Sequence, residues 1–143
     1  MTQYASFGKR FLAALLDGVI LMIISILVGF VLGLILGILL GNSDSAKVTA
    51  GLVSNIAGIV IGWLYYAKQE SSPKQATIGK DALGIVVTDL EGKRISFTKA
   101  TVRHFSKILS GLILLIGYIM AAFTEKKQGL HDMIAGTLVV NKR

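Results

Sequence analysis

The feature that most constrains this chain is a stretch of thirty residues, 11–40, which are apolar or small except for Asp17, the only ionisable side chain among them. About 20 residues of α-helix are enough to cross the hydrocarbon core of a bilayer. Because the stretch exceeds that minimum, the helix is able to tilt or to begin in the headgroup layer. We therefore predict that residues 11–40 form a transmembrane helix rather than a cleaved signal peptide, with Asp17 near the end at which the helix enters the bilayer.

A second charge stands just before this helix, because Arg10 precedes Asp17 by seven residues. Seven residues are about two helical turns, so the two side chains are expected on the same side of the helix. A carboxylate inside a bilayer costs about 2.5 to 3.5 kcal/mol on insertion scales, and it usually has a partner. Two hypotheses follow: an ion pair that sets the depth and packing of the helix, or a carboxylate that binds a proton or a cation beside the guanidinium.

Four glycines recur at every fourth position in and just after the first span, which places them on one face of the helix: Gly29, Gly33, Gly37 and Gly41. Small residues at this spacing let helix backbones approach closely within a membrane. The pattern predicts packing against another helix of the same chain or against a second copy in a homo-oligomer.

Two further apolar segments cover about residues 48–67 and 106–123. The first of these is long enough for a second firm span, whereas the other is marginal for a crossing. A single crossing would place the C-terminus on the side opposite the N-terminus, and a bent or re-entrant segment would return it. The basic residues that follow the third segment favour the return.

The polar region between the second and third segments, 68–105, is also strongly basic. Residues 68–107 hold eight of the fifteen Lys and Arg residues, and the turn before the second span holds one. The positive-inside rule therefore predicts a cytoplasmic N-terminus and a cytoplasmic 68–105 region. Leu83 to Thr88 has the β-branched composition of a strand, and Arg94 to Phe97 is expected to return as its hairpin partner. Gly136 to Asn141 reads as a further strand that would pair with this hairpin.

The net charge of +7 does not indicate nucleic-acid binding, because the basic residues cluster beside hydrophobic segments. Lipid headgroups of the bilayer are the partner that this distribution favours. The chain has no cysteine and only two distant histidines, so no metal site is predicted. Phosphate-binding loops and nucleophile elbows are absent from the sequence, so we predict neither an enzyme nor a cofactor.

These features together predict an all-α integral membrane protein with one domain over residues 1–143. It would contain two firm transmembrane helices, a third short hydrophobic segment, and a small cytoplasmic β element.

Three stretches resemble the RDD family of small multi-pass bacterial membrane proteins. They are ASFGKRFLAALLDGVIL at 5–21, ATIGKDALGIVVTDLEGKRISF at 76–97 and GLHDMIAGTLVV at 129–140. The resemblance maps the arginine and two aspartates of the family name onto Arg10, Asp17 and Asp132. It implies a location in the bacterial inner membrane, and it implies cation/proton exchange as a candidate activity. Asp81 departs from the family pattern, which commonly has a basic residue after the Gly-Lys pair.

The leading functional hypothesis is therefore transport of monovalent cations and protons. Asp17 and Asp132 are the candidate ion- or proton-binding carboxylates, and Arg10 and Arg103 are the candidate modulating charges. The rival hypothesis is a non-transporting membrane scaffold or assembly factor, in which the same charges only hold the fold together.

Overall fold

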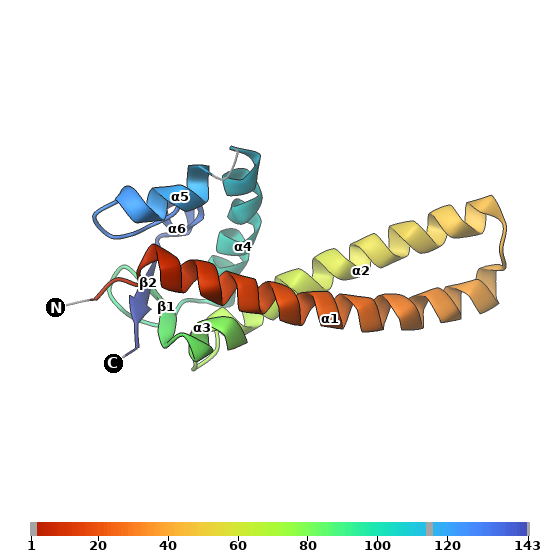
Figure 1. Ribbon diagram of the computed structural model, residues 1–143, viewed down its shortest axis with the longest axis horizontal. Helices are drawn as coiled ribbons and strands as arrows, with labels where there is room; N and C mark the ends of the chain where they lie inside the picture. Colours follow the sequence, from red (N-terminus) through yellow and green to blue (C-terminus); the bar gives the residue numbers. More distant parts are fainter. Residues whose placement is uncertain (1–2, 114–115, 143) are drawn as a thin grey trace. The chain divides into compact units, whose positions relative to one another are not determined.

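The computed structural model describes residues 3–113 and 116–142, and it is predominantly helical (Figure 1). Two long helices come first, α1 at Phe7–Leu40 and α2 at Asp44–Glu70. Four shorter helices and two strands follow in the order α3 (Ile78–Ala82), β1 (Ile85–Asp89), α4 (Phe97–Leu112), α5 (Ile116–Phe123), α6 (Leu130–Ala135) and β2 (Thr137–Asn141). The predicted class, two long apolar helices with a third hydrophobic segment and a small β element, is confirmed.

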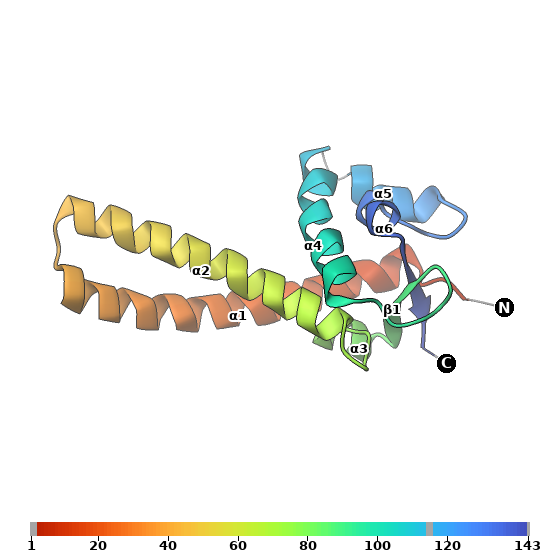
Figure 2. The same cartoon turned by 180° about the vertical axis from the view of Figure 1, so that it is seen from behind.

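The chain forms two compact units. One unit comprises the described residues up to Asp17 together with those from Trp63 onward, and the other comprises Gly18–Gly62. In this second unit, the outer parts of α1 and α2 are joined by a short turn, and they lie side by side in both views (Figures 1 and 2). We call the first of these the folded unit and the second the helical hairpin.

The helical hairpin exposes large apolar side chains along both of its helices, as membrane-spanning segments do. In α1, for example, Phe30 is 67% exposed and Ile38 is 83% exposed. By length and composition, α1 and α2 are both able to cross a membrane. Within the hairpin, no atom lies within 4 Å of a Cβ added at any of the four predicted packing glycines, 29, 33, 37 and 41. The predicted packing against a helix of the same chain is therefore not found there, and self-association stays a prediction.

The third hydrophobic segment consists of two helices, α4 and α5, which are bent by 102° relative to each other. Residues 114 and 115, which belong to the predicted third span, lie outside the described residues. The bent pair packs with α6, and Figure 2 shows these three helices together. The segment that follows the bent pair contacts the start of the chain, because the N–H of Ala5 donates to the carbonyl of Val139 at 2.9 Å. The two ends of the chain are thus neighbours in the folded unit, as the bent alternative predicted.

The β element is a two-stranded antiparallel sheet in which Val87 of β1 faces Val139 of β2. The predicted hairpin between Leu83–Thr88 and Arg94–Phe97 is wrong, whereas the predicted strand near the C-terminus is present and pairs with β1. The reason is local, since Ser96 accepts a hydrogen bond from the N–H of Lys99 at 3.1 Å and so begins helix α4 at Phe97. Serine is among the preferred N-cap residues, and its side chain satisfies a backbone N–H in the first turn of the helix.

The core of the folded unit is made of small and β-branched side chains. Fully or almost fully buried members come from α1, α2, α4, both strands and the segments that precede α1 and α4: Ala5, Ala13, Ala67, Ile85, Val87, Ile95, Ala100 and Val139. Trp63 covers this core, and its indole N–H donates to the Thr101 hydroxyl at 2.9 Å. The core therefore fixes the first turns of α1 against the sheet and α4, which positions the charged residues described next.

Candidate functional site

The Asp17 carboxylate is completely buried in the folded unit and accepts hydrogen bonds from neutral donors. The Tyr65 hydroxyl donates to Oδ1 at 2.7 Å, and the Thr77 hydroxyl donates to Oδ2 at 2.6 Å. The backbone N–H of Gly79 donates to Oδ1 at 2.8 Å. These three donors come from α2, from the residue that caps α3, and from α3 itself, so the carboxylate joins three segments of the chain.

Gly79 makes this arrangement possible because it lies directly against α1. A Cβ added there would be 2.8 Å from Cγ of Asp17 and would also overlap the carbonyl oxygen of Ala13. Only glycine allows the α3 backbone to come this close. Thr77 completes the contact, because its hydroxyl also accepts from the N–H of Lys80 at 3.3 Å and so caps α3.

Asp132 forms a separate buried site with two arginines. Its carboxylate pairs with Arg10 from α1 and with Arg103 from α4, whose Nε lies 2.9 Å from Oδ1. The carboxylate also accepts from the N–H of Gly129 at 2.9 Å, which stabilises the first turn of α6. Arg10 donates in addition to the carbonyl of Lys127 at 2.7 Å. Asp132 therefore attaches the start of α1 to α4 and α6.

Arg103 extends this network to a second carboxylate, Glu70 at the end of α2. Its Nη1 lies 2.6 Å and 2.7 Å from the two carboxylate oxygens of Glu70. Lys80 donates to the same carboxylate at 2.8 Å. Arg103 is only 2% exposed and Glu70 is fully buried, so these charges depend on one another for stability. We refer to Arg10, Glu70, Lys80, Arg103 and Asp132 as the buried charge network.

The protonation states in α6 follow from this network. Burial alone would raise the pKa of Asp132, but Arg103 and Arg10 outweigh burial and hold that pKa far below its usual range. Burial lowers the pKa of the neighbouring His131 to about 3, against the opposing effect of Asp132. The imidazole is consequently neutral at physiological pH, with its Nδ1 3.2 Å from the Ser110 hydroxyl.

The structure separates the three residues that the sequence grouped together. Arg10 pairs with Asp132, whereas Asp17 lies with Tyr65, Thr77 and Gly79, so the predicted Arg10–Asp17 pair is wrong. Arg10 and Asp17 are two helical turns apart, which puts both side chains on one side of α1. The same two turns separate the two residues by about 10 Å along the helix axis. Each charge is therefore met by a closer partner from another segment. Arg103, expected to modulate Asp132, does contact it.

Several members of these sites were not predicted from the sequence. Glu70 and Lys80 belong to no motif that would mark a site, and Tyr65 and Tyr66, at the end of the second apolar segment, are typical of an interfacial aromatic belt. A usable signal existed for Glu70, because it is the only acidic residue between Asp44 and Asp81. Asp81, which departs from the family pattern, has no part in the network and pairs with Lys142 at 3.0 Å.

A pocket of about 440 Å³ opens beside the buried charge network within the folded unit. Its lining combines apolar and aromatic side chains with four basic ones: Phe7, Arg10, Phe11, Ala14, Tyr66, Lys80, Arg103, Lys107, Tyr118, Ile119 and His131. None of these residues is acidic. We call this space the basic pocket. The ammonium group of Lys107 lies 3.7 Å from the centre of the Tyr66 ring.

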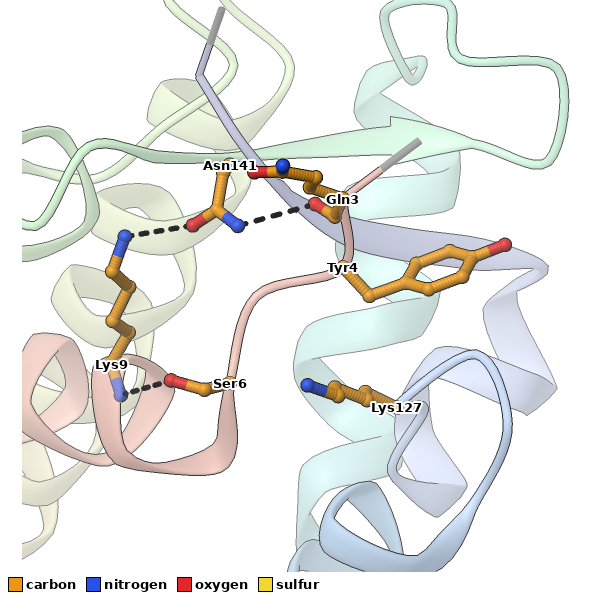
Figure 3. A pocket seen from close by; sticks show the side chains of 6 residues that line it. All are labelled: Gln3, Tyr4, Ser6, Lys9, Lys127 and Asn141. Carbon is orange, nitrogen blue, oxygen red and sulfur yellow. Dashed lines mark hydrogen bonds between the residues drawn. The ribbon is translucent and has the colours of Figure 1, made fainter. Parts of the chain in front are cut away.

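A second pocket of about 450 Å³ lies near the chain ends (Figure 3). Its lining is polar, and Lys9 donates to the Asn141 side chain across it at 2.8 Å. Figure 3 shows the Tyr4 and Lys127 side chains on the opposite side of the same space. It is more open to solvent than the basic pocket and contains no member of the buried charge network, so we regard the basic pocket as the stronger candidate site.

Comparison with known proteins agrees with the resemblance noted in the sequence. A family model described as the RDD family matches residues 4–136. The uncharacterized protein YxaI of Bacillus subtilis (strain 168) is 38% identical over 99% of this chain and 100% of its own length. The uncharacterized membrane protein YteJ of the same organism is 30% identical over 98% of this chain and 82% of its own length. No solved structure matches the chain. The chain belongs to the RDD family, and it is a membrane protein.

Proposed function

We propose that this RDD-family protein is a non-transporting membrane scaffold or assembly factor, in which the charged residues hold the folded unit together at the start of the first span. The observation that carries the proposal is the saturation of the two family aspartates. Asp17 accepts three hydrogen bonds, and Asp132 accepts from two arginines and a backbone N–H. Carboxylates that are already fully engaged are suited to fixing a structure rather than to exchanging ions.

The energetics of burial support the same role. Removing one partner from a buried ion pair costs about 3 to 5 kcal/mol, because an uncompensated charge stays behind. Arg103 joins two such carboxylates, Glu70 and Asp132, so its removal would leave both incompletely compensated. An arrangement of this kind connects the ends of α1 and α2 to α4 and α6, which is what a stable membrane-associated platform needs.

The second candidate function is cation/proton exchange, with Asp17 as the exchanging carboxylate, Arg10 as its modulating charge and Asp132 as its partner. One observation favours it: among residues 3–113 and 116–142, no basic side chain forms an ion pair or hydrogen bond with Asp17. Neutral donors alone balance that charge, and a proton or monovalent cation would neutralise it. The glycine face of residues 29–41 would then assemble several copies around a shared path.

Charge near the network argues against cations as the ligand of the basic pocket. Four basic side chains line that pocket and would repel a positive ion.

The surrounding membrane is proposed to be the bacterial inner membrane, with the N-terminus in the cytoplasm, because the polar region after the second span is the most basic part of the chain.

Replacing Asp17 by Asn separates the two candidates. Wild-type protein and the variant would be reconstituted into proteoliposomes, and proton flux driven by sodium or potassium would be compared with the thermal unfolding midpoint in detergent. If the protein is a scaffold, we expect no cation-dependent flux in the wild type and a lower unfolding midpoint in the variant. The midpoint should fall because the side-chain NH2 group of asparagine is itself a donor and would face hydrogen-bond donors that now point at the Asp17 carboxylate. Flux in the wild type that is lost in a variant of unchanged stability would contradict it and establish exchange.

A further inference from the structure

We propose that the basic pocket binds the phosphate headgroup of an anionic phospholipid, with the acyl chains of that lipid lying over the exposed aromatic side chains of α1. This inference concerns a ligand and stands independently of the scaffold proposal, since either candidate function would accommodate a bound lipid.

The basic pocket has an excess of positive charge. Of the four basic side chains that line the pocket, Arg10, Lys80 and Arg103 already compensate the two carboxylates of the buried charge network. Lys107 is the fourth, and among the described residues it forms no ion pair with a carboxylate. A partly buried ammonium group without an acidic partner is costly, and an anionic ligand would remove that cost.

The excess charge lies beside an aromatic ring and close to a second basic group. The ammonium groups of Lys107 and Lys80 lie 3.7 Å and 5.4 Å from the centre of the same Tyr66 ring. The aromatic ring therefore holds Lys107 near the network without satisfying its three hydrogen-bond donors. A phosphate group offers several acceptor oxygens in a small volume, so one phosphate would accept from Lys107 and from a neighbouring basic group together.

The pocket also has an apolar side, which favours a lipid over a soluble anion. Phe11 is 57% exposed, Phe7 is 37% exposed, and their rings stack with centroids 6.4 Å apart. Ile119 on α5 is 44% exposed and lines the same pocket. Exposed apolar side chains next to basic ones suit an amphiphile that has a negative head and hydrocarbon chains. The volume of about 440 Å³ lies in the usual range for small-ligand pockets.

The place of the pocket along α1 is consistent with such a ligand. Helix α1 has 34 residues, whereas about 20 residues cross the hydrocarbon core. Residues from the first two turns of α1, including Arg10, therefore have room to lie at headgroup level, where the phosphates of a bilayer are found.

The test uses the full chain purified in a zwitterionic detergent. Its thermal unfolding midpoint would be measured during titration with phosphatidylglycerol, and then with phosphatidylcholine of the same acyl chains and with inorganic phosphate. We expect phosphatidylglycerol to raise the midpoint in a saturable way. Phosphatidylcholine and inorganic phosphate should have much smaller effects at equal concentration, since the first has no net charge and the second has no acyl chains.

Three lysine variants make the test specific to the pocket. Lys107→Gln should weaken the apparent affinity for phosphatidylglycerol about tenfold, because it removes a charge-assisted hydrogen bond. Lys99→Gln on the same helix is the matched control, since Lys99 is exposed and is not among the lining residues. Lys107→Arg keeps the positive charge and should retain binding.

Three results would overturn the proposal. Equal losses in Lys107→Gln and Lys99→Gln would indicate general attraction to a charged surface. Equal stabilisation by the two lipids would exclude recognition of the negative headgroup. Stabilisation by inorganic phosphate as strong as that by phosphatidylglycerol would identify a site for a soluble anion. If Lys107→Gln does not fold in the detergent, a folded Phe11→Ser variant becomes the deciding one. Loss of phosphatidylglycerol binding in Phe11→Ser would support the proposal, and unchanged binding in that variant would contradict it.

Discussion

The backbone N–H of Gly79 donates a hydrogen bond of 2.8 Å to the carboxylate of Asp17, which joins residues 62 positions apart in the chain. This contact brings a short helix of the polar region directly against the first transmembrane segment. An intramembrane aspartate is expected by default to mark a functional site. Here the carboxylate is also the point at which α3 meets α1.

Replacing Gly79 by Ala should destabilise the folded unit by about 1 to 3 kcal/mol, because the new methyl group overlaps α1 and weakens the hydrogen bond to Asp17. Thermal unfolding in detergent measures this change. Gly111→Ala is the matched control, since a Cβ at Gly111 meets no atom within 4 Å. Equal midpoints for the two variants would show that the close approach of Gly79 does not matter for stability.

Replacing Tyr65 by Phe should cost about 1 to 2 kcal/mol of stability, because it removes one donor from a buried carboxylate and changes little else. The neighbouring Tyr66→Phe variant is the control: its ring remains available to Lys107, and its hydroxyl has no hydrogen-bond partner among the described residues. Chemical denaturation of both variants provides the comparison. A larger loss for Tyr66→Phe would mean that the Tyr65–Asp17 bond is not the stabilising one.

Replacing Arg103 by Met should cost about 3 to 5 kcal/mol, since Glu70 and Asp132 would keep their charges in a buried site without their shared partner. Arg103→Lys should fall between this variant and the wild type, because an ammonium group cannot bridge two carboxylates as a guanidinium does. Arg94→Met serves as the control, because Arg94 is exposed. Expression level and unfolding midpoint both report the difference, and similar values for Arg103→Met and Arg94→Met would disprove the role of the network.

Stability should fall as the pH drops from about 6.5 toward 3, and His131 should account for part of that fall. Burial lowers the pKa of folded His131 to about 3 from an ordinary value of 6.5. Between these values the unfolded chain binds a proton that folded His131 does not, so acid favours unfolding. Asp132, whose pKa is lowered from an ordinary 3.8, contributes only at more acidic pH.

The measurement is the unfolding midpoint of wild type and His131→Gln across this pH range. The variant should show a shallower decline, because it lacks the titrating imidazole while all other groups are shared. If the unfolding midpoint declined with pH equally steeply in the wild type and the variant, His131 would not be kept neutral by burial.

Much of the architecture was predictable because it depends on local composition. An apolar run such as 11–40 has to be helical in a bilayer, where every backbone polar group needs an internal partner. The same reasoning predicted the second span, and the strand near the C-terminus was recognisable from its β-branched residues. Arg10, Arg103 and Asp132 were all candidate site residues in the sequence, although the sequence did not predict which of these charges contact one another.

The errors arose where distant segments compete for one partner. Strand β1 was expected to pair with residues 94–97, yet Ser96 caps α4, which begins at Phe97, and β1 pairs instead with residues 137–141. Arg10 was assigned to Asp17 because the two are near in sequence. In the folded unit, Asp132 comes from the other end of the chain and takes that arginine.

By itself, therefore, the sequence determined the membrane spans, the helical class and the family, because these follow from hydrophobic length and short motifs. Only the tertiary structure decided which charges share a site. Ion pairs and hydrogen bonds act over about 3 Å, and a one-dimensional spacing along α1 does not contain the positions of α3, α4 and α6. The three residues of the family signature consequently lie in two sites, one around Asp17 with neutral donors and one around Asp132 with two arginines.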